Sequence, residues 1–201
     1  MATIKPFIGI RPSKDKASRI AALPYDVYNR EEARVEVEKE PLSFLRIDRP
    51  ETQFAPDMDM YDAKVYQKAH DILWDMVKHG DFVTEEKPCY YIYELTMNGR
   101  VQDGLVACAS IDDYINEVIK KHEKTREEKE QDRIRHVDVC DAQTGPIFLA
   151  YRARAVIREI IEVKKQEAPL YDFTSEDGIR HRVFCIDCEE QIQTIQKEFE
   201  Q

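Results

Sequence analysis

Residues 89–110 read CYYIYELTMNGRVQDGLVACAS, and this stretch decides the class of fold. Its first seven residues are mostly aromatic and aliphatic residues that favour strands. Asn98-Gly99 is the strongest short signal for a two-residue hairpin turn, and residues 101–110 return as the partner strand. The sequence therefore predicts a β-hairpin here.

Helices are expected on both sides of this hairpin. The clearest covers residues 58–79, where apolar residues recur at three- and four-residue spacing and Gly80 can end the helix. Asn29 with Glu32, and Thr125 with Glu128, have the spacing of capping boxes. They predict helices that begin there and cover residues 30–40 and 126–137. Further helices are expected over residues 111–114, over 153–165 and from 187 onward.

The remaining apolar stretches are interpreted as strands. Residues 42–47 predict a short strand, 146–151 a buried strand, and 170–174 with 180–186 a second hairpin. Residues 4–26 predict a short strand followed by an ordered loop. Hairpins mixed with helical crossovers indicate an α+β fold, with a mixed sheet and flanking helices. The last helix runs to residue 201 without a stop signal, which suggests that the chain is cut short.

The amino-acid composition limits which classes of protein this chain can belong to. The 201 residues carry 40 Asp and Glu against 30 Lys and Arg, for a net charge of -10. This balance argues against nucleic-acid binding, which relies on basic side chains. No apolar run is long enough to span a membrane. The odd count of 5 cysteines is typical of free thiols in a reducing compartment, so a cytoplasmic location is expected.

The richest candidate site is the loop His122-Glu123-Lys124-Thr125, which follows the end of a strand expected at the apolar residues 118–119. A helix expected to begin at Thr125 would present unpaired amides that can hold an anion. Glu123 beside the imidazole of His122 could act as a general base towards a hydroxyl. Asp132 and Arg133, about two turns into that helix, could brace the loop. Spacing alone fits a simple cap and a solvated charged helix at least as well.

Two further motifs are ambiguous. Pro24-Tyr25-Asp26 can line a pocket or close a turn over a core, and Arg11-Pro12 shares the same unperiodic segment. Cys185 and Cys188 have C-x-x-C spacing, but no second ligand pair follows. Packing is therefore the favoured interpretation, and no metal site is predicted. No glycine-rich phosphate loop occurs either.

The chain as a whole resembles a known family. Nearly its full length is similar to the bacterial domain of unknown function ten-fifteen, also called SpoOJ/ParB-like. The resemblance rests on the segments Gly9-Ile10-Arg11-Pro12, Pro24-Tyr25-Asp26-Val27, Gly104-Leu105-Val106, Ser110-Ile111-Asp112-Asp113-Tyr114, Ile119-Lys120-Lys121-His122-Glu123-Lys124-Thr125, Asp132-Arg133 and Gly145-Pro146-Ile147-Phe148. The family is similar, more distantly, to the ParB/sulfiredoxin fold, which includes a free-serine kinase that uses ADP.

The resemblance implies an activity and its residues. Glu123 matches the base of the kinase-like group, with His122 beside it and Pro146-Ile147 in the strand position. Thr125, Lys124, Arg133, Pro24, Tyr25, Asp26 and Arg11 would bind substrate or phosphate. The family is about twice as long, and its Asp-Gly-His-His-Arg motif has no counterpart here. Residues 1–100 are therefore expected to form an N-terminal α/β segment, and 101–201 an incomplete ParB/sulfiredoxin-like unit that lacks this half.

Three functions follow from this interpretation. The first is a fragment of a nucleotide-dependent phosphoryl-transfer enzyme that acts on a small hydroxyl compound. ADP or ATP would bind only in the full-length protein, and this chain alone would be inactive. The second is a ParB-like nucleotide switch or protein-interaction module without catalysis. The third is a scaffold half whose open sheet edge pairs with the missing C-terminal half or with a second copy.

Overall fold

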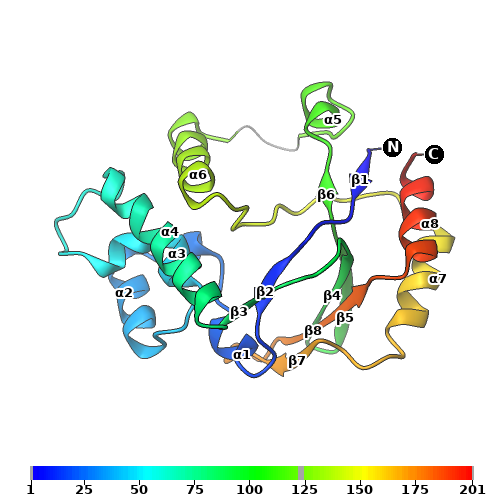
Figure 1. Cartoon of the computed structure of the whole chain (residues 1–201), viewed down its shortest axis with the longest axis horizontal. Helices are drawn as coiled ribbons and strands as arrows, with labels where there is room; N and C mark the ends of the chain where they lie inside the picture. Colours follow the sequence, from blue (N-terminus) through cyan, green and yellow to red (C-terminus); the bar gives the residue numbers. More distant parts are fainter. Residues whose placement is uncertain (1, 122–124, 201) are drawn as a thin grey trace. The chain divides into compact units, whose positions relative to one another are not determined.

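The computed structural model describes residues 2–121 and 125–200 (Figure 1). These residues form two compact units. The sheet unit comprises residues 2–14, 84–121 and 149–200, and the helical unit comprises 15–83 and 125–148. Both are discontinuous in sequence, whereas the expected boundary near residue 100 falls in a hairpin. That residues 101–201 begin a ParB-like domain stays a prediction.

The sheet unit is built on the predicted hairpin. β4 (Tyr90–Met97) and β5 (Arg100–Val106) pair antiparallel, and Asn98 and Gly99 between them have φ of 50° and 76°. Both positive values fit the turn that the Asn-Gly pair predicts. β7 (Tyr171–Thr174) and β8 (Arg180–Ile186) form the second predicted hairpin, and the antiparallel strand order is β5-β4-β8-β7. The α+β class is confirmed.

Two helices cover one face of this sheet. α7 (Ala155–Lys164) and α8 (Glu189–Glu200) pack beside each other, as Figure 1 shows. Alternation along β4 and β8 directs Tyr90, Ile92 and Phe184 into a shared core with Ile157 and Ile195. β1 (Ile4–Lys5) pairs with β6 (Cys108–Ala109), and α5 (Ile111–Ile115) forms where a helix is predicted, with Ser110 as its N-cap residue. β2 (Ile10–Pro12) and β3 (Phe82–Thr84) are short strands.

The helical unit consists of short helices around α4 (Ala63–Lys78). The others are α1 (Ala17–Ile20), the 3-10 helix η1 (Tyr25–Val27), α2 (Arg30–Lys39), α3 (Leu45–Asp48), the 3-10 helix η2 (Pro50–Gln53) and α6 (Glu127–Cys140). α4 packs against α3 and α6. The apolar spacing predicts this helix, although it begins at Ala63 and not near residue 58, and Gly80 after its end has a φ of 75°. Across α4 and α6, Trp74 Nε1 donates a hydrogen bond of 3.0 Å to the carbonyl oxygen of Cys140.

Several local predictions are wrong. Residues 42–47 contain the start of α3 instead of a strand, with Leu45 and Ile47 buried on it. Residues 146–151 form no regular structure, and the side chains of Ile147 and Phe148 are 74% and 78% exposed. Residues 118–121 form no strand. Short apolar runs do not distinguish a strand from a helix or an exposed loop.

The second capping box is also absent. α6 begins at Glu127, and its N-cap residue is Arg126, whose side chain makes no capping hydrogen bond. Glu128 instead accepts a hydrogen bond of 3.1 Å from the hydroxyl of Tyr61 on the segment before α4. A tertiary contact therefore replaces the local contact that the spacing of Thr125 and Glu128 predicts.

The first capping box is present and gives a test. Oδ1 of Asn29 accepts from the amides of Glu31 and Glu32 at 2.9 and 3.0 Å, and Glu32 accepts from the Asn29 amide. Asn29→Ala should lower the free energy of unfolding by about 1 kcal/mol, because two helix amides lose their acceptor. Glu31→Gln keeps these bonds and should change it by less than about 0.5 kcal/mol. Urea unfolding of both variants measures the difference, and equal losses would contradict the role of the cap.

Candidate functional site

The loop that the sequence favours most is only partly described. His122, Glu123 and Lys124 lie outside the described residues. Thr125 is exposed and precedes the N-cap residue of α6. Glu127, Glu128 and Glu130 give the first turn of that helix a negative charge. Lys129 offsets only one of these charges, so most of the positive charge that an anion would need must come from outside this turn.

Arg133 of α6 and Tyr25 of η1, which the sequence marks as separate candidates, lie together. The guanidinium carbon of Arg133 lies 4.5 Å from the centroid of the Tyr25 ring, a cation–π contact. On its other side, Nε and Nη2 of Arg133 donate to Oδ2 of Asp132 at 3.3 and 3.1 Å. Among the described residues, Nη1 has no hydrogen-bond acceptor, and the Arg133 side chain is 30% exposed. Pro24 and Asp26, beside Tyr25, are exposed.

A buried carboxylate holds Arg133 in place. The side chain of Asp132 is 5% exposed, and its Oδ1 accepts a hydrogen bond of 2.8 Å from the hydroxyl of Tyr66 on α4. Burial raises the pKa of Tyr66, and the hydrogen bond to Asp132 adds to this effect. Tyr66 is therefore a neutral donor at neutral pH. The direction of the Asp132 carboxylate, and with it that of Arg133, is set by the contact between α4 and α6.

A second buried group lies one turn further along α6. Nε2 of His136 is 4.0 Å from Oδ1 of Asp48 and 3.9 Å from Sγ of Cys140. Burial lowers the pKa of His136 to about 4, and the charge of Arg133 acts in the same direction. Burial raises the pKa of Asp48 to about 6, although Arg133 opposes the shift.

This group is not a nucleophilic triad. Both of its contacts involve the same imidazole nitrogen, whereas a relay needs one contact on each nitrogen. Nδ1 of His136 is buried and has no hydrogen-bond partner among the described residues. Burial also raises the pKa of the Cys140 thiol to about 11, and the side chain is fully buried. The group supports the packing of α6 and provides no attacking thiolate.

Arg49 is a residue that sequence reasoning missed. It is buried, and its Nε donates to Glu51 at 2.6 Å. Its Nη1 donates to the carbonyl oxygens of Tyr25 and Tyr28 at 3.1 and 2.7 Å. These bonds hold η1, so the ring of Tyr25 stays in position over Arg133. Since the contacts with Tyr25 and Tyr28 join residues more than 20 positions apart, no local spacing could have revealed them.

Arg11 belongs to the sheet unit, where it binds a different carboxylate. Its Nε donates to Oε1 of Glu85 at 2.5 Å, and its Nη1 donates to the hydroxyl of Tyr171 at 3.2 Å. The Tyr171 hydroxyl in turn donates to the carbonyl oxygen of Pro12. Glu85 also belongs to a group of metal-capable donors with Cys89 and Cys185, whose ligand atoms all lie within 4.8 Å of one another. Cys188 is exposed and does not belong to this group among the described residues.

Comparisons with known proteins identify a family. The model of a family described as "Protein of unknown function (DUF1015)" matches residues 4–201. No curated protein and no solved structure matches the chain significantly. Within residues 2–121 and 125–200, no helix has both the length and the apolar character needed to cross a membrane. The cytoplasmic location stays a prediction.

Proposed function

The chain belongs to the DUF1015 family of proteins of unknown function, and from this premise we propose that it supplies the substrate side of a phosphoryl-transfer site. The acceptor would be a small hydroxyl compound, and the donor a nucleotide such as ADP or ATP bound in a longer member of the family. Glu123 would be the general base, with His122, Lys124 and Thr125 orienting the acceptor or its phosphate. Arg133 would contact a phosphoryl oxygen.

The observation that carries this proposal is the geometry of Arg133. Its guanidinium is fixed on one edge by Asp132 and on one face by Tyr25, while Nη1 has no described acceptor. A planar guanidinium with a free donor edge suits a phosphate oxygen. Phosphoryl transfer relies mainly on such fixed positive charge and on positioning. Tyr66 hydrogen-bonds to Asp132, and Arg49 hydrogen-bonds to the carbonyl oxygen of Tyr25, so both partners of Arg133 are themselves held.

Ligand binding can be tested on this chain. Inorganic phosphate, ADP, ATP and CTP are titrated while the thermal midpoint is followed, because a ligand that binds only the native state raises it. Phosphate should raise the midpoint of the unmodified chain. Each variant is compared with its own ligand-free midpoint, so that a loss of basal stability is not mistaken for a loss of binding. Arg133→Ala should abolish the phosphate shift.

Arg135→Ala is the matched control, because Arg135 has the same charge on the same helix and is exposed. It should retain the full shift. Arg133→Lys keeps the positive charge but loses the planar set of guanidinium donors. It should retain only part of the phosphate shift. A phosphate shift that persists in Arg133→Ala would rule out the assigned contact.

Catalysis is tested in a longer family member. The substitution Glu123→Gln, made at the matching position, should reduce the turnover rate at least about 100-fold, because the base is lost. It should leave the fold intact. Retained turnover would exclude Glu123 as the base. Nucleotide binding without turnover in the unmodified longer protein would favour the regulatory switch over the enzyme.

A further inference from the structure

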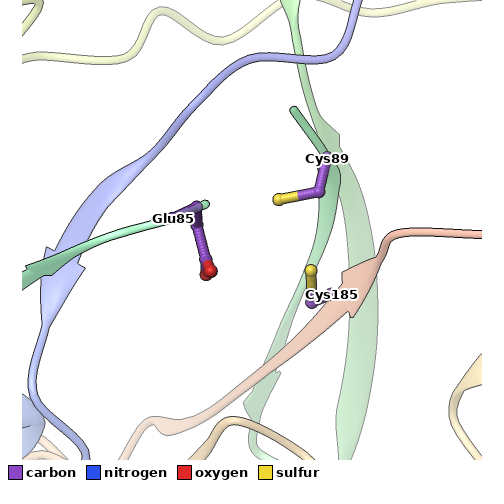
Figure 2. Close-up of side chains that lie close together, drawn as sticks. All are labelled: Glu85, Cys89 and Cys185. Atoms are coloured by element: carbon purple, nitrogen blue, oxygen red, sulfur yellow. The ribbon is translucent and has the colours of Figure 1, made fainter. Parts of the chain in front are cut away.

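Two cysteines far apart in the sequence converge with a glutamate inside the sheet unit. Figure 2 shows the sulfur atoms of Cys89 and Cys185 and the carboxylate of Glu85 directed towards one another. Glu85 follows β3, Cys89 immediately precedes β4, and Cys185 lies near the end of β8. Their ligand atoms all lie within 4.8 Å of one another. Cys89 is 1% exposed and Cys185 is partly buried, so the group is recessed from the surface.

The segment that carries two of these donors is held rigidly. The amide of Glu85 donates to the carbonyl oxygen of Gly9 at 2.9 Å, and Cys89 and Phe7 exchange backbone hydrogen bonds of 3.0 and 3.1 Å. Both ends of the 85–89 loop are therefore fixed to one extended segment. Cys185 is fixed by its place opposite Tyr91 in the β4–β8 pairing. Preformed donors reduce the ordering that ligand binding would otherwise require.

The glutamate presents one free oxygen. Arg11 Nε and the Tyr91 hydroxyl both donate to Oε1 of Glu85, at 2.5 and 3.3 Å. Among the described residues, Oε2 accepts no hydrogen bond, so it is available to a cation. Supporting hydrogen bonds of this kind typically orient metal-binding carboxylates. A tyrosine fits here because the neighbouring position is glycine: a Cβ on Gly9 would lie 2.3 Å from the Tyr91 hydroxyl oxygen.

We propose that Glu85, Cys89 and Cys185 bind a thiophilic divalent cation, of which Zn²⁺ is the best match. Two thiolates and one carboxylate oxygen are ligands that Zn²⁺ accepts in tetrahedral geometry. Three protein ligands leave the fourth position to water or to a substrate. Binding converts the two thiols to thiolates and releases their protons to solvent. The charges then balance, because two thiolates and Glu85 are offset by Zn²⁺ and Arg11.

This assignment differs from the C-x-x-C interpretation of the sequence. Cys188 would be the expected partner of Cys185 by spacing, yet it lies outside the group and is exposed. Burial raises the pKa of Cys185 to about 12, and the neighbouring Cys89 adds to the shift. Without a cation the Cys185 thiol is therefore neutral at pH 7. The site is independent of the phosphate contact proposed for Arg133, so either proposal can fail alone.

Cobalt substitution provides the test. The reduced, metal-free chain is titrated with Co²⁺, whose thiolate charge-transfer band in the near ultraviolet and visible d–d bands report sulfur ligation and tetrahedral geometry. One equivalent of Co²⁺ should saturate both bands, and Zn²⁺ should displace it. Cys89→Ser and Cys185→Ser should each reduce the charge-transfer band and weaken binding by at least about tenfold. Cys108→Ser and Cys188→Ser, at exposed cysteines, should leave both bands unchanged.

Glu85→Gln keeps the size of the side chain and both thiols. It therefore tests the site even if the serine variants do not fold. It should keep the charge-transfer band but weaken Co²⁺ affinity at least about tenfold. Absence of the band in the unmodified chain, or its persistence at full intensity in Cys185→Ser, would overturn the proposal. A thiol count of three instead of the five cysteines, in denaturant without reductant, would also overturn it if peptide mapping places the disulfide between Cys89 and Cys185.

Discussion

Glu94→Ala should lower the free energy of unfolding by about 3–5 kcal/mol, because it leaves two cations without their shared carboxylate. Glu94 is 2% exposed on the covered face of β4. Its two oxygens accept from Nε and Nη2 of Arg182 at 2.6 and 2.7 Å. Nζ of Lys165 lies 2.9 Å from Oε2 of Glu94 and 2.9 Å from Asp103 on β5. One buried carboxylate thus links three neighbouring segments of the sheet unit.

The ionised state of Glu94 is favoured by these contacts. Hydrogen bonding from Arg182 lowers the pKa of Glu94, burial opposes the shift, and Lys165 lowers the pKa further. The charged carboxylate therefore stabilises the fold above its ordinary pKa, and this contribution is lost as the pH falls through the lowered folded value. The side chain of Lys165 is only 12% exposed, so its ammonium group is poorly placed to gain hydration from solvent when Glu94 is removed.

An exposed pair in the same sheet is the matched control. Arg180 donates to Asp172 at 2.8 and 2.6 Å with the same two-bond geometry, but their side chains are 49% and 38% exposed. Asp172→Ala should therefore cost less than about 1 kcal/mol. Urea unfolding at neutral pH, followed by circular dichroism, measures both variants. Equal losses in the two variants would show that burial of Glu94 adds nothing to the interaction.

Asp48→Asn should stabilise the protein more at pH 7 than at pH 4, by about 2–3 kcal/mol. Burial raises the pKa of Asp48 from 3.8 to about 6, although the charge of Arg133 opposes this. The native state therefore binds this proton more tightly than the unfolded chain. The stability that results is fully present below about pH 4 and is lost as the pH rises through about 6. Asparagine does not ionise, so the variant avoids this loss.

His136→Asn should show the opposite pH dependence. Burial lowers the pKa of His136 from 6.5 to about 4, and Arg133 adds to the shift. Above about pH 6.5 the imidazole is neutral in both states, but between about 6.5 and 4 the unfolded chain gains a proton that the native state does not. Stability is lost over that range, and the variant avoids the loss. In the unmodified chain the two groups therefore largely cancel between about pH 4 and 6.

Urea unfolding at about pH 4, 5, 6 and 7 measures both variants against the unmodified chain. Taking the difference at each pH removes the contributions of groups that do not interact with residues 48 and 136. Because His136 and Asp48 lie 4.0 Å apart, the double variant measures the coupling between them. Difference curves that slope in opposite directions would support buried titration at both sites. Two flat curves, or two parallel ones, would contradict it.

Elements with strong local signals were predictable. The turn at Asn98-Gly99 needs two residues with positive φ, and the pair satisfies this by itself. The apolar spacing of α4 and the capping box at Asn29 likewise depend on neighbours within a few residues. The apolar run 146–151 failed as a predictor because hydrophobicity alone does not decide whether a chain is paired in a sheet.

The candidate sites show the same division. Sequence alone determined the family resemblance, the charged α6 and the individual candidates Arg11, Tyr25 and Arg133. Only the tertiary structure decided which groups meet: Arg133 with Tyr25 across 108 positions, and Cys185 with Cys89 across 96. It also decided that Asp48 and His136 lie in a buried setting that shifts both pKa values. The physical reason is that turns and caps are satisfied within a few residues, whereas desolvation and ligand convergence depend on packing between distant segments.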